Sequence, residues 1–340
     1  MEIKTNIPFK EITTMRLGGN ARFVAEVETA EDVATVCKNA KSQNLPIFVI
    51  GDGSNLIAKD TGFNGIMIHI KIPGFEVISE DDTSTTIKIG AGENWDSTVE
   101  KCVDMNLSGI EAMSAIPGTV GATPIQNVGA YGQEIADTLQ SVEAYDINED
   151  KYTTIQAADC KLTYRSSIFR EDAINRYIIT SITIKLSKDQ PKPPFYSSLQ
   201  KYLDANNIKD YTNKVIRDSV IKIRKEKLPD YRVEASSGSF FKNVIIDQAK
   251  LEELNATYPD VPNFDGEDNK FKIPTGWLID KAGLKGKLIH GMRVYETNAV
   301  VLVNESAGSY NDLASARDEI TKIIKDKFNL DIEQEPLEIP

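Results

Sequence analysis

A segment dense in glycine and proline, Ala115–Gly132, is the part of this sequence best suited to bind a ligand through its backbone. Glycine costs roughly 1 kcal/mol in a helix interior and proline about 3 kcal/mol, so the segment is expected to be a folded loop. Small side chains let such a loop present successive N–H groups to a phosphate or to the carbonyl edge of a flavin. A turn-rich surface loop is the alternative reading. The apolar residues Ile116, Val120, Ile125 and Val128 favour a loop anchored in a core.

A second glycine-rich segment, Gly51–Asn55, directly follows the apolar run Pro46–Ile50. Leu56 stands where the dinucleotide fingerprint GxGxxG needs its third glycine, and no helix pattern follows, so this is not a Rossmann motif. Backbone N–H groups, helped by the Ser54 and Asn55 side chains, could still bind a pyrophosphate. A tight turn between two strands explains the same residues equally well.

Three further segments carry groups that binding and proton transfer need. Leu162–Phe169 holds a tyrosine, an arginine and two serines between apolar residues. Arg224, Lys225 and Lys227 form the basic cluster that an anionic ligand would require, although a solvated helix end also explains it. Ser236–Asn243 mixes hydroxyl groups with paired phenylalanines, which neither a plain strand nor a plain loop requires.

The composition limits the classes of function. The 340 residues, 41% of them hydrophobic, are expected to form two or three domains. The net charge of −12 supplies no field that would attract nucleic acid or an anionic membrane surface. The N-terminal residues lack the apolar core of a signal peptide, and no apolar run approaches the ~20 residues that span a bilayer. A soluble, cytoplasmic protein is therefore expected.

The few cysteines and histidines argue against disulfides and metal centres. Cys37, Cys102 and Cys160 are odd in number, far apart and without CxxC spacing, which indicates reduced thiols in core positions. His69 and His290 are the only histidines, so neither a zinc site nor a histidine-based catalytic triad is supported. No metal is expected.

Hydrophobic periodicity predicts the elements that position these segments. Strands are expected at Ala21–Val27, Pro46–Ile50, Gly65–Ile70, Phe75–Ser79, Thr85–Gly90, Leu139–Ile147, Tyr177–Leu186 and Ala299–Val303. Helices are expected after the N-cap residue Thr29 and at Asn94–Leu107, Thr212–Lys225, Thr275–Lys281 and Ser309–Phe328. The short strands favour a mostly antiparallel sheet, and Lys188–Pro194 is typical of a linker between domains.

Eight separated motifs, in this order, make the chain similar to the UDP-N-acetylenolpyruvoylglucosamine reductase family, the MurB flavoenzymes of peptidoglycan synthesis. They are TMRLGG, GDGSN, IPGTVGATPIQNVGAYG, YRSSIF, KLPD, GSFFKN, GWLID and the closing EQE. The resemblance covers nearly the whole chain. It implies an α+β fold, in which an FAD-binding module of the vanillyl-alcohol-oxidase type, built of two subdomains, precedes a C-terminal α+β substrate-binding domain.

The resemblance also implies domain limits and an activity. Residues 1–190 would form the FAD-binding domain, with two subdomains of about 1–65 and 66–190. Residues 191–310 would form the domain that binds the UDP-sugar. Residues 311–340 would form a C-terminal helix and a tail that returns to the active site. The implied reaction reduces UDP-N-acetylglucosamine enolpyruvate to UDP-N-acetylmuramate with NADPH as hydride donor. This reaction serves cell-wall biogenesis, cell shape and cell division. A monomer without nucleic-acid or membrane partners is expected.

Carried over residue by residue, the resemblance makes Gly51, Gly53, Ser54 and Asn55 the pyrophosphate-binding loop. The other implied FAD contacts are Arg16, Ile116, Pro117, Gly118, Gly121, Gly129, Ala130 and Tyr131. The implied catalytic residues are Arg165 beside the enolpyruvyl carboxylate, Ser239 as proton donor and Glu335 as its acidic partner. The implied contacts with the UDP-sugar are Tyr164, Tyr196, Lys227, Asn243 and Asn298.

Two positions depart from the pattern of the family. The long segment Asn255–Phe271, together with Tyr196, resembles the larger family type, in which an extra loop covers the substrate. Phe264 stands where that loop usually has a tyrosine, which puts a hydroxyl contact in doubt. The final motif is EQE rather than EPE, so both carboxylates are kept while the turn between them is looser.

Two other functions remain open from the sequence. An FAD-dependent oxidase of the same fold would pass electrons to oxygen, and many such oxidases tether FAD through histidine or cysteine. Neither His69 nor His290 lies in a glycine-rich loop, which counts against this reading. A catalytically silent UDP-sugar-binding protein is the other alternative, and the presence of Arg165, Ser239 and Glu335 counts against it.

Overall fold

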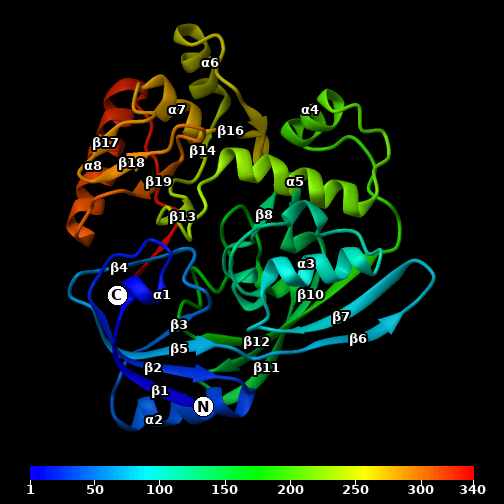
Figure 1. Cartoon of the computed structure of the whole chain (residues 1–340), viewed down its shortest axis with the longest axis vertical. Coiled ribbons are helices and arrows are strands. Elements are labelled where there is room, and N and C mark those ends of the chain that lie inside the picture. The colour runs from blue at the N-terminus through cyan, green and yellow to red at the C-terminus, as the bar shows by residue number, and fades with distance from the viewer. The chain divides into compact units, whose positions relative to one another are not determined.

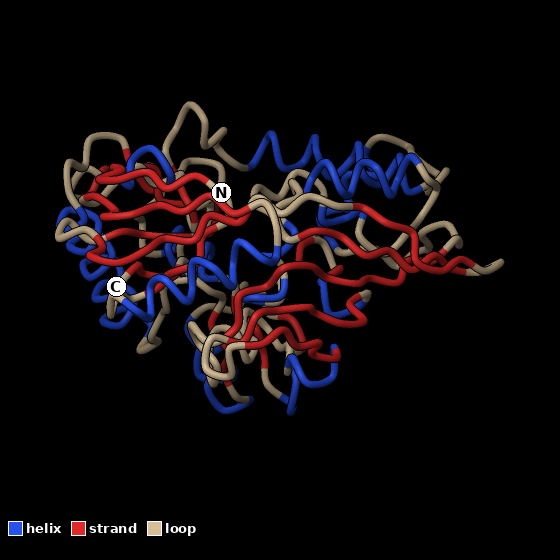
Figure 2. Tube along the Cα trace, turned by 90° about the horizontal axis from the view of Figure 1, so that it is seen from below, coloured by secondary structure: helices blue, strands red, loops and turns tan.

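The computed structural model describes residues 1–340, apart from the side chain of Glu267. The chain forms two compact units. Unit 1 consists of Met1–Ile7, Ala21–Gly53 and Asn64–Glu226, and unit 2 consists of Pro8–Asn20, Ser54–Phe63 and Lys227–Pro340. Helices and mainly antiparallel strands occur in both (Figures 1 and 2), which confirms the expected α+β class. The domain limits at about 65, 190 and 310 stay a prediction.

Unit 1 contains a four-stranded sheet, and the glycine-rich segment that begins at Gly51 directly follows one of its strands. Its strands lie in the order β1 (Glu2–Pro8), β2 (Asn20–Val27), β5 (Phe63–Ile70) and β3 (Ile47–Ile50), and β3 pairs in parallel with β5. Helix α2 (Ala30–Ser42) begins where the Thr29 side chain accepts a hydrogen bond from the Asp32 N–H group, as its residue type predicts. Its apolar stripe is buried as expected, at Val33, Val36, Cys37 and Ala40.

A five-stranded antiparallel sheet forms the centre of unit 1. Its strands are β11 (Lys151–Gln156), β10 (Leu139–Asp146), β12 (Tyr177–Ser187), β7 (Ser84–Gly90) and β6 (Phe75–Glu80), in that order. Helix α3 (Trp95–Asp104) buries Trp95 and Val99 in the same apolar core as β7 and β12. Helices α4 (Ser197–Ala205) and α5 (Asn213–Lys227) form a smaller apolar cluster with each other and with Ala112.

Unit 2 is organised around a second antiparallel sheet and two helices. The sheet has the order β13 (Ser236–Ser239), β19 (Val301–Asn304), β18 (Met292–Val294) and β17 (Leu288–Ile289). Helices α7 (Thr275–Lys281) and α8 (Tyr310–Phe328) contribute their buried faces to the core of this unit. The smaller elements are α1 (Phe9–Ile12), α6 (Gln248–Thr257), the sheet of β14 (Val244–Ile246), β16 (Phe271–Ile273) and β15 (Phe264–Asp265), and the parallel pair β4 (Leu56–Ala58) and β20 (Leu337–Ile339).

The strands and helices expected from hydrophobic periodicity are confirmed to within a few residues, and those with little periodicity were not foreseen. β1 and β11 are mostly exposed, so they lack an alternating apolar face. α4 is only nine residues long, and α6 buries only Leu251 and Leu254. The three cysteines are free and buried, which confirms the expected core positions.

Helix α8 gives a test of local stability. Ser309 and Asp312 form a reciprocal capping box, in which each side chain accepts a hydrogen bond of 3.1 Å from the other residue's N–H group. Replacing the hydroxyl removes one of these bonds, so Ser309→Ala should lower the free energy of unfolding by about 1 kcal/mol. Urea denaturation followed by circular dichroism measures it. The exposed Ser306→Ala is the matched control, and equal stability of both variants would contradict the prediction.

Candidate functional site

The loop Ala115–Gly132 is folded, and its backbone is fixed to the end of β7 and the start of α3. The Val120 and Gly121 N–H groups donate to the carbonyls of Glu93 and Ala91, each at 2.9 Å, and the Gly118 carbonyl accepts from the Trp95 N–H group at 3.0 Å. Short 3-10 turns occur at Val120–Ala122 and Pro124–Gln126, followed by the two-residue pair β8 (Gly129–Ala130) and β9 (Gln133–Glu134). Ile116, Val120 and Ile125 contribute to the apolar core, as expected for anchors.

Several glycines of this loop are required by space or by backbone conformation. A Cβ atom on Gly121 would lie 2.6 Å from the Ala91 Cβ, and one on Gly129 would lie 2.8 Å from the Gln133 carbonyl oxygen. Gly118 has a φ of +128°, which side-chain-bearing residues rarely adopt. Gly118 and Thr119 are buried, and their N–H groups donate to no backbone carbonyl of the described residues. Backbone donors of this kind fit a flavin or phosphate ligand.

The two glycine-rich segments of the sequence meet within unit 1. A Cβ atom on Gly51 would lie only 2.4 Å from the Thr119 Oγ1 atom, so the segment Gly51–Asn55 rests, at Gly51, directly against the loop Ala115–Gly132. Gly53 has a φ of +65°. Ser54 and Asn55 belong to unit 2, where the Ser54 carbonyl accepts from Thr14 Oγ1 at 3.4 Å and the Asn55 carbonyl accepts from the Leu337 N–H group at 3.1 Å.

The segment Leu162–Phe169 packs on the same loop. Arg165, partly buried and with a φ of +54°, donates from Nη2 to the Gly129 carbonyl at 3.3 Å. Its guanidinium lies 5.4 Å from the centre of the Tyr164 ring. The Ser167 hydroxyl donates to the Ile125 carbonyl at 2.6 Å. The predicted catalytic arginine therefore lies beside a predicted flavin-binding glycine.

Two predicted tyrosines contact each other near the end of the loop. The Tyr131 and Tyr196 rings meet edge to face, with 6.2 Å between their centres. Burial raises the pKa of Tyr131, so its hydroxyl stays protonated and can donate a hydrogen bond at neutral pH. Tyr196 is 40% exposed, at the start of α4, and is accessible to a ligand from solvent.

In unit 2, the predicted proton donor and its acidic partner lie on neighbouring backbone segments. Ser236 pairs with Val303 and Ser239 with Val301, so β13 has one extra residue, a bulge that includes Gly238 at a φ of +73°. Directly after Ser239, the Phe240 carbonyl accepts from the Glu335 N–H group at 2.8 Å. Glu335 is 7% exposed.

The other predicted residues of unit 2 surround the same strands. The Asn243 side chain accepts from the Thr275 N–H group at 3.2 Å, at the start of α7. The Asn298 carbonyl accepts from the Val301 N–H group at 3.0 Å in β19. The Thr297 hydroxyl, adjacent to Asn298 in sequence, donates to the Lys227 carbonyl at 3.2 Å. The backbone of the exposed Lys227 is thereby held next to Thr297, the residue before Asn298.

Arg16 and Phe264 have other surroundings. Arg16 donates from Nη2 to the carbonyls of Tyr231 and Arg232, at 3.1 and 2.6 Å, and so holds the segment that follows the KLPD motif. Its contact with FAD stays a prediction. Phe264 lies in β15, paired with Lys272 of β16, and is partly buried. The segment around it is therefore folded as part of a small sheet.

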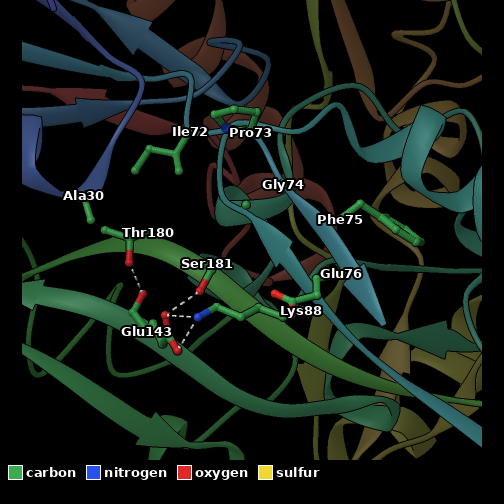
Figure 3. A pocket seen from close by; sticks show the side chains of 11 residues that line it. Ala30, Ile72, Pro73, Gly74, Phe75, Glu76, Lys88, Glu143, Thr180 and Ser181 are labelled. Carbon is green, nitrogen blue, oxygen red and sulfur yellow. Dashed lines mark hydrogen bonds and ion pairs between the residues drawn. The ribbon is translucent and has the colours of Figure 1, made fainter. Parts of the chain in front are cut away.

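Unit 1 also has a cavity of about 250 Å³ beside the five-stranded sheet (Figure 3). Its polar side chains point toward one another, since Lys88 Nζ lies 2.7 Å from the Glu143 carboxylate, which also accepts from Ser181 Oγ at 3.0 Å. None of the predicted site residues lines it. Among the described residues, no group of histidine, cysteine, aspartate or glutamate side chains could hold a metal ion. No described helix combines the length and the apolar character that crossing a membrane requires.

Comparison with known proteins identifies the family. Residues 21–154 match the model of an FAD binding domain, and residues 229–339 match the C-terminal domain of UDP-N-acetylenolpyruvoylglucosamine reductase. The reductases of Ralstonia nicotianae and Flavobacterium johnsoniae are each 37% identical to this chain, over 98% of it and over 98% and 99% of their own lengths. The chain belongs to the UDP-N-acetylenolpyruvoylglucosamine reductase family.

A solved structure of this family agrees with the fold. The reductase of Thermus caldophilus superimposes with a TM-score of 0.69 and 22% identity, and the match covers both chains completely. The FAD-binding match in the N-terminal part and the reductase match in the C-terminal part confirm the predicted fold class and family. The catalytic roles of Arg165, Ser239 and Glu335 stay predictions.

Sequence reasoning missed the residues that support the loop from behind. Thr119 contacts Gly51, and Ala91 fills the space next to Gly121. Asp96 accepts from the Ala115 N–H group at 2.6 Å. These residues belong to no recognisable sequence motif. A threonine, alanine or aspartate that supports a loop cannot be distinguished, from sequence alone, from the same residue type elsewhere in the chain. The isolated threonine between two glycines was the one available signal.

The contact between Gly51 and Thr119 predicts a pair of compensating substitutions. In Gly51→Ala the new Cβ atom would overlap Thr119 Oγ1, and overpacking of this kind should weaken FAD binding roughly tenfold. Removing the hydroxyl in Gly51→Ala/Thr119→Ala should restore most of the affinity. The measurement is a titration of apoprotein with FAD. Gly308→Ala is the control, because the nearest atom to its added Cβ would be the Asp312 Oδ2 atom, 3.9 Å away. Failure of the second substitution to restore binding would refute the contact.

Proposed function

We propose that this protein is the FAD-dependent enzyme that reduces UDP-N-acetylglucosamine enolpyruvate to UDP-N-acetylmuramate with NADPH, in peptidoglycan precursor synthesis. The observation that carries the proposal is the 37% identity to reductases of this name over nearly their whole length. The two family matches and the hydrogen bond from Arg165 to Gly129 of the glycine-rich loop support it. An oxidase or a silent UDP-sugar-binding protein is not favoured by these similarities. A cytoplasmic monomer belongs to the same proposal.

The cofactor would be held by the glycine-rich backbone. Gly51 and Gly53, with Ser54 and Asn55, bind the pyrophosphate, and the loop from Ile116 to Tyr131 binds the isoalloxazine. FAD supplies, when bound, the transfer of a hydride from NADPH to C3 of the enolpyruvyl group. The closeness of the backbone at Gly121 and Gly129 supports this assignment, because a Cβ atom at either position would displace its neighbours.

Arg165 would bind the substrate carboxylate. Negative charge spreads over C2 and the carboxylate as C3 gains a hydride, so a permanently charged, fork-shaped group is suited to stabilise it. The hydrogen bond from Nη2 to Gly129 supports this role, because it fixes the guanidinium before substrate arrives.

Ser239 would donate the proton to C2. A serine hydroxyl is a weak acid, so it works only when its position is fixed over the carbon and its oxygen is stabilised as the proton leaves. The bulge at Gly238 and the strand pairing on both sides of Ser239 support a fixed position. Glu335, placed next to Phe240, would complete the site as the acidic partner.

The UDP moiety would be held by the remaining residues. Lys227 attracts a phosphate as an exposed cation, and Asn243 and Asn298 offer amide groups near the same strands. Tyr164 and Tyr196 offer aromatic faces. The domain limits of 1–190, 191–310 and 311–340 belong to the same proposal.

The colour of the purified protein tests the proposed activity. The protein should be yellow, bleach with NADPH under anaerobic conditions, and recover its absorbance when UDP-N-acetylglucosamine enolpyruvate is added. Recovery only with oxygen would indicate an oxidase. A colourless protein that binds the UDP-sugar would indicate the silent binding protein. Absorbance spectra recorded before and after each addition distinguish the three outcomes.

The proton donor can be tested by separating the two halves of the reaction. In Ser239→Ala, reduction by NADPH should keep the parent rate, because it needs no proton at C2. Reoxidation by the enolpyruvyl substrate should slow by on the order of 10²–10⁴, and Ser239→Cys should recover part of the loss, because a thiol is the stronger acid. Stopped-flow absorbance measures each half. Ser237→Ala, on the same strand, is the control. Equal slowing of both halves by Ser239→Ala would make Ser239 a structural hydroxyl.

A further inference from the structure

The loop Ala115–Gly132 begins with a strained residue. Ala115 has a φ of +58°, in the left-handed region that a residue with a Cβ atom enters at a cost of roughly 1 kcal/mol or more. Such a conformation persists only where the surroundings determine it. The left-handed backbone conformation at Ala115 sets the path of the residues that follow, Ile116, Pro117 and Gly118. The groups that hold the Ala115 backbone therefore influence the whole loop.

The N–H side of Ala115 is held by an ion pair. The Asp96 carboxylate accepts from the Ala115 N–H group at 2.6 Å and is itself bound by Arg217, with Nη1 to Oδ1 at 2.6 Å and Nη2 to Oδ2 at 3.2 Å. The Arg217 side chain is 7% exposed. Burial by itself would raise the pKa of Asp96, yet the hydrogen bonds from Arg217 and Ala115 hold that pKa below its usual value. The carboxylate is therefore ionised and fixed in orientation.

The carbonyl side of Ala115 is held by a second arginine. Arg224 donates from Nε to the Ala115 carbonyl at 3.3 Å, and its guanidinium also interacts with the Tyr131 hydroxyl at the other end of the loop. Burial lowers the pKa of Arg224, because the charged form loses contact with water. Arg217 and Arg224 lie on α5 with six residues between them, two helical turns, so they share one face of the helix.

We propose that Arg217, through Asp96, and Arg224 are positioning residues that clamp the Ala115 backbone from both sides and thereby shape the loop that binds FAD. None of the three residues carries a role in the reaction proposed above. Helix α5 thereby supports a loop whose own regular structure is limited to two 3-10 turns and a two-residue strand. The inference rests on the proposed function, since it takes the loop to be the flavin site.

A double-mutant cycle on the apoprotein tests the clamp. Arg224→Met and Asp96→Asn should each raise the dissociation constant for FAD about tenfold, because each loses a hydrogen bond that involves a charged group. Both changes release the same residue, so their effects should not add. The double variant should bind FAD about as weakly as whichever single variant binds it less tightly. Independent effects would instead weaken binding about a hundredfold relative to the parent protein. Arg224→Lys should restore part of the affinity, since a lysine can donate to the same carbonyl. The visible absorption spectrum of the bound flavin should shift in Arg224→Met and return toward that of the parent in Arg224→Lys.

Exposed residues of the same helix provide matched controls. Lys222→Met and Asp218→Asn change charge on α5 without touching the loop, and should leave FAD affinity and spectrum unchanged. Strictly additive losses, or an Arg224→Met variant that binds FAD like Lys222→Met, would overturn the clamp. A parent protein that binds no FAD, or a Gly129→Val variant that binds it normally, would instead overturn the proposed flavin site. Far-ultraviolet circular dichroism of each variant identifies any that fails to fold, and Arg224→Lys then decides the result.

Discussion

Close packing of glycine backbone against its neighbours around the loop Ala115–Gly132 is the constraint on which unit 1 depends. Gly51, Gly121 and Gly129 each occupy a place where a Cβ atom would lie less than 3 Å from a neighbour. Interiors are packed densely enough that an added methyl group forces its surroundings to shift, at a cost of roughly 1–3 kcal/mol. The same closeness brings N–H groups within reach of a ligand, so the packing that restricts these positions to glycine also creates the binding surface.

In unit 2, backbone contacts of the C-terminal tail fix the position of a predicted site residue, Glu335. The Lys242 N–H group donates to the Glu333 carbonyl at 2.9 Å, and Phe241 forms a bridge with Gln334. A few residues later the tail pairs in parallel with β4, next to Asn55. Arg317 of α8 holds the tail by donating to the Gln334 and Glu338 side chains at 3.1 and 2.8 Å. These contacts fix Glu335 next to Phe240, although the EQE motif lacks the proline that would stiffen it.

Although acidic residues outnumber basic ones in this protein, the cations of the predicted sites occupy distinct places. The basic cluster at the end of α5 looks uniform in the sequence. In the helix its members point in different directions, because successive residues are rotated about the helix axis. Arg224 donates to the Ala115 carbonyl, whereas Lys225 and Lys227 are exposed. Arg165 lies against Gly129. An arginine can bridge several carbonyl or carboxylate oxygens at once, which suits the positions of Arg165 and Arg224 against the backbone. A flexible lysine suits a phosphate that arrives from solvent.

The sequence by itself determined the family, the glycine-rich segments and the helices with strong caps and apolar stripes. Ser309 and Thr29 begin their helices as their residue types predict, because capping and periodicity are local. Only the tertiary structure decided that Gly51 meets Thr119, that Arg165 lies on Gly129, and that Asp96, Arg217 and Arg224 hold Ala115. Arg217 and Arg224 are more than a hundred residues from Ala115 in the chain. No local pattern records a contact between segments that far apart, because it depends on how sheets and helices pack rather than on neighbouring residues.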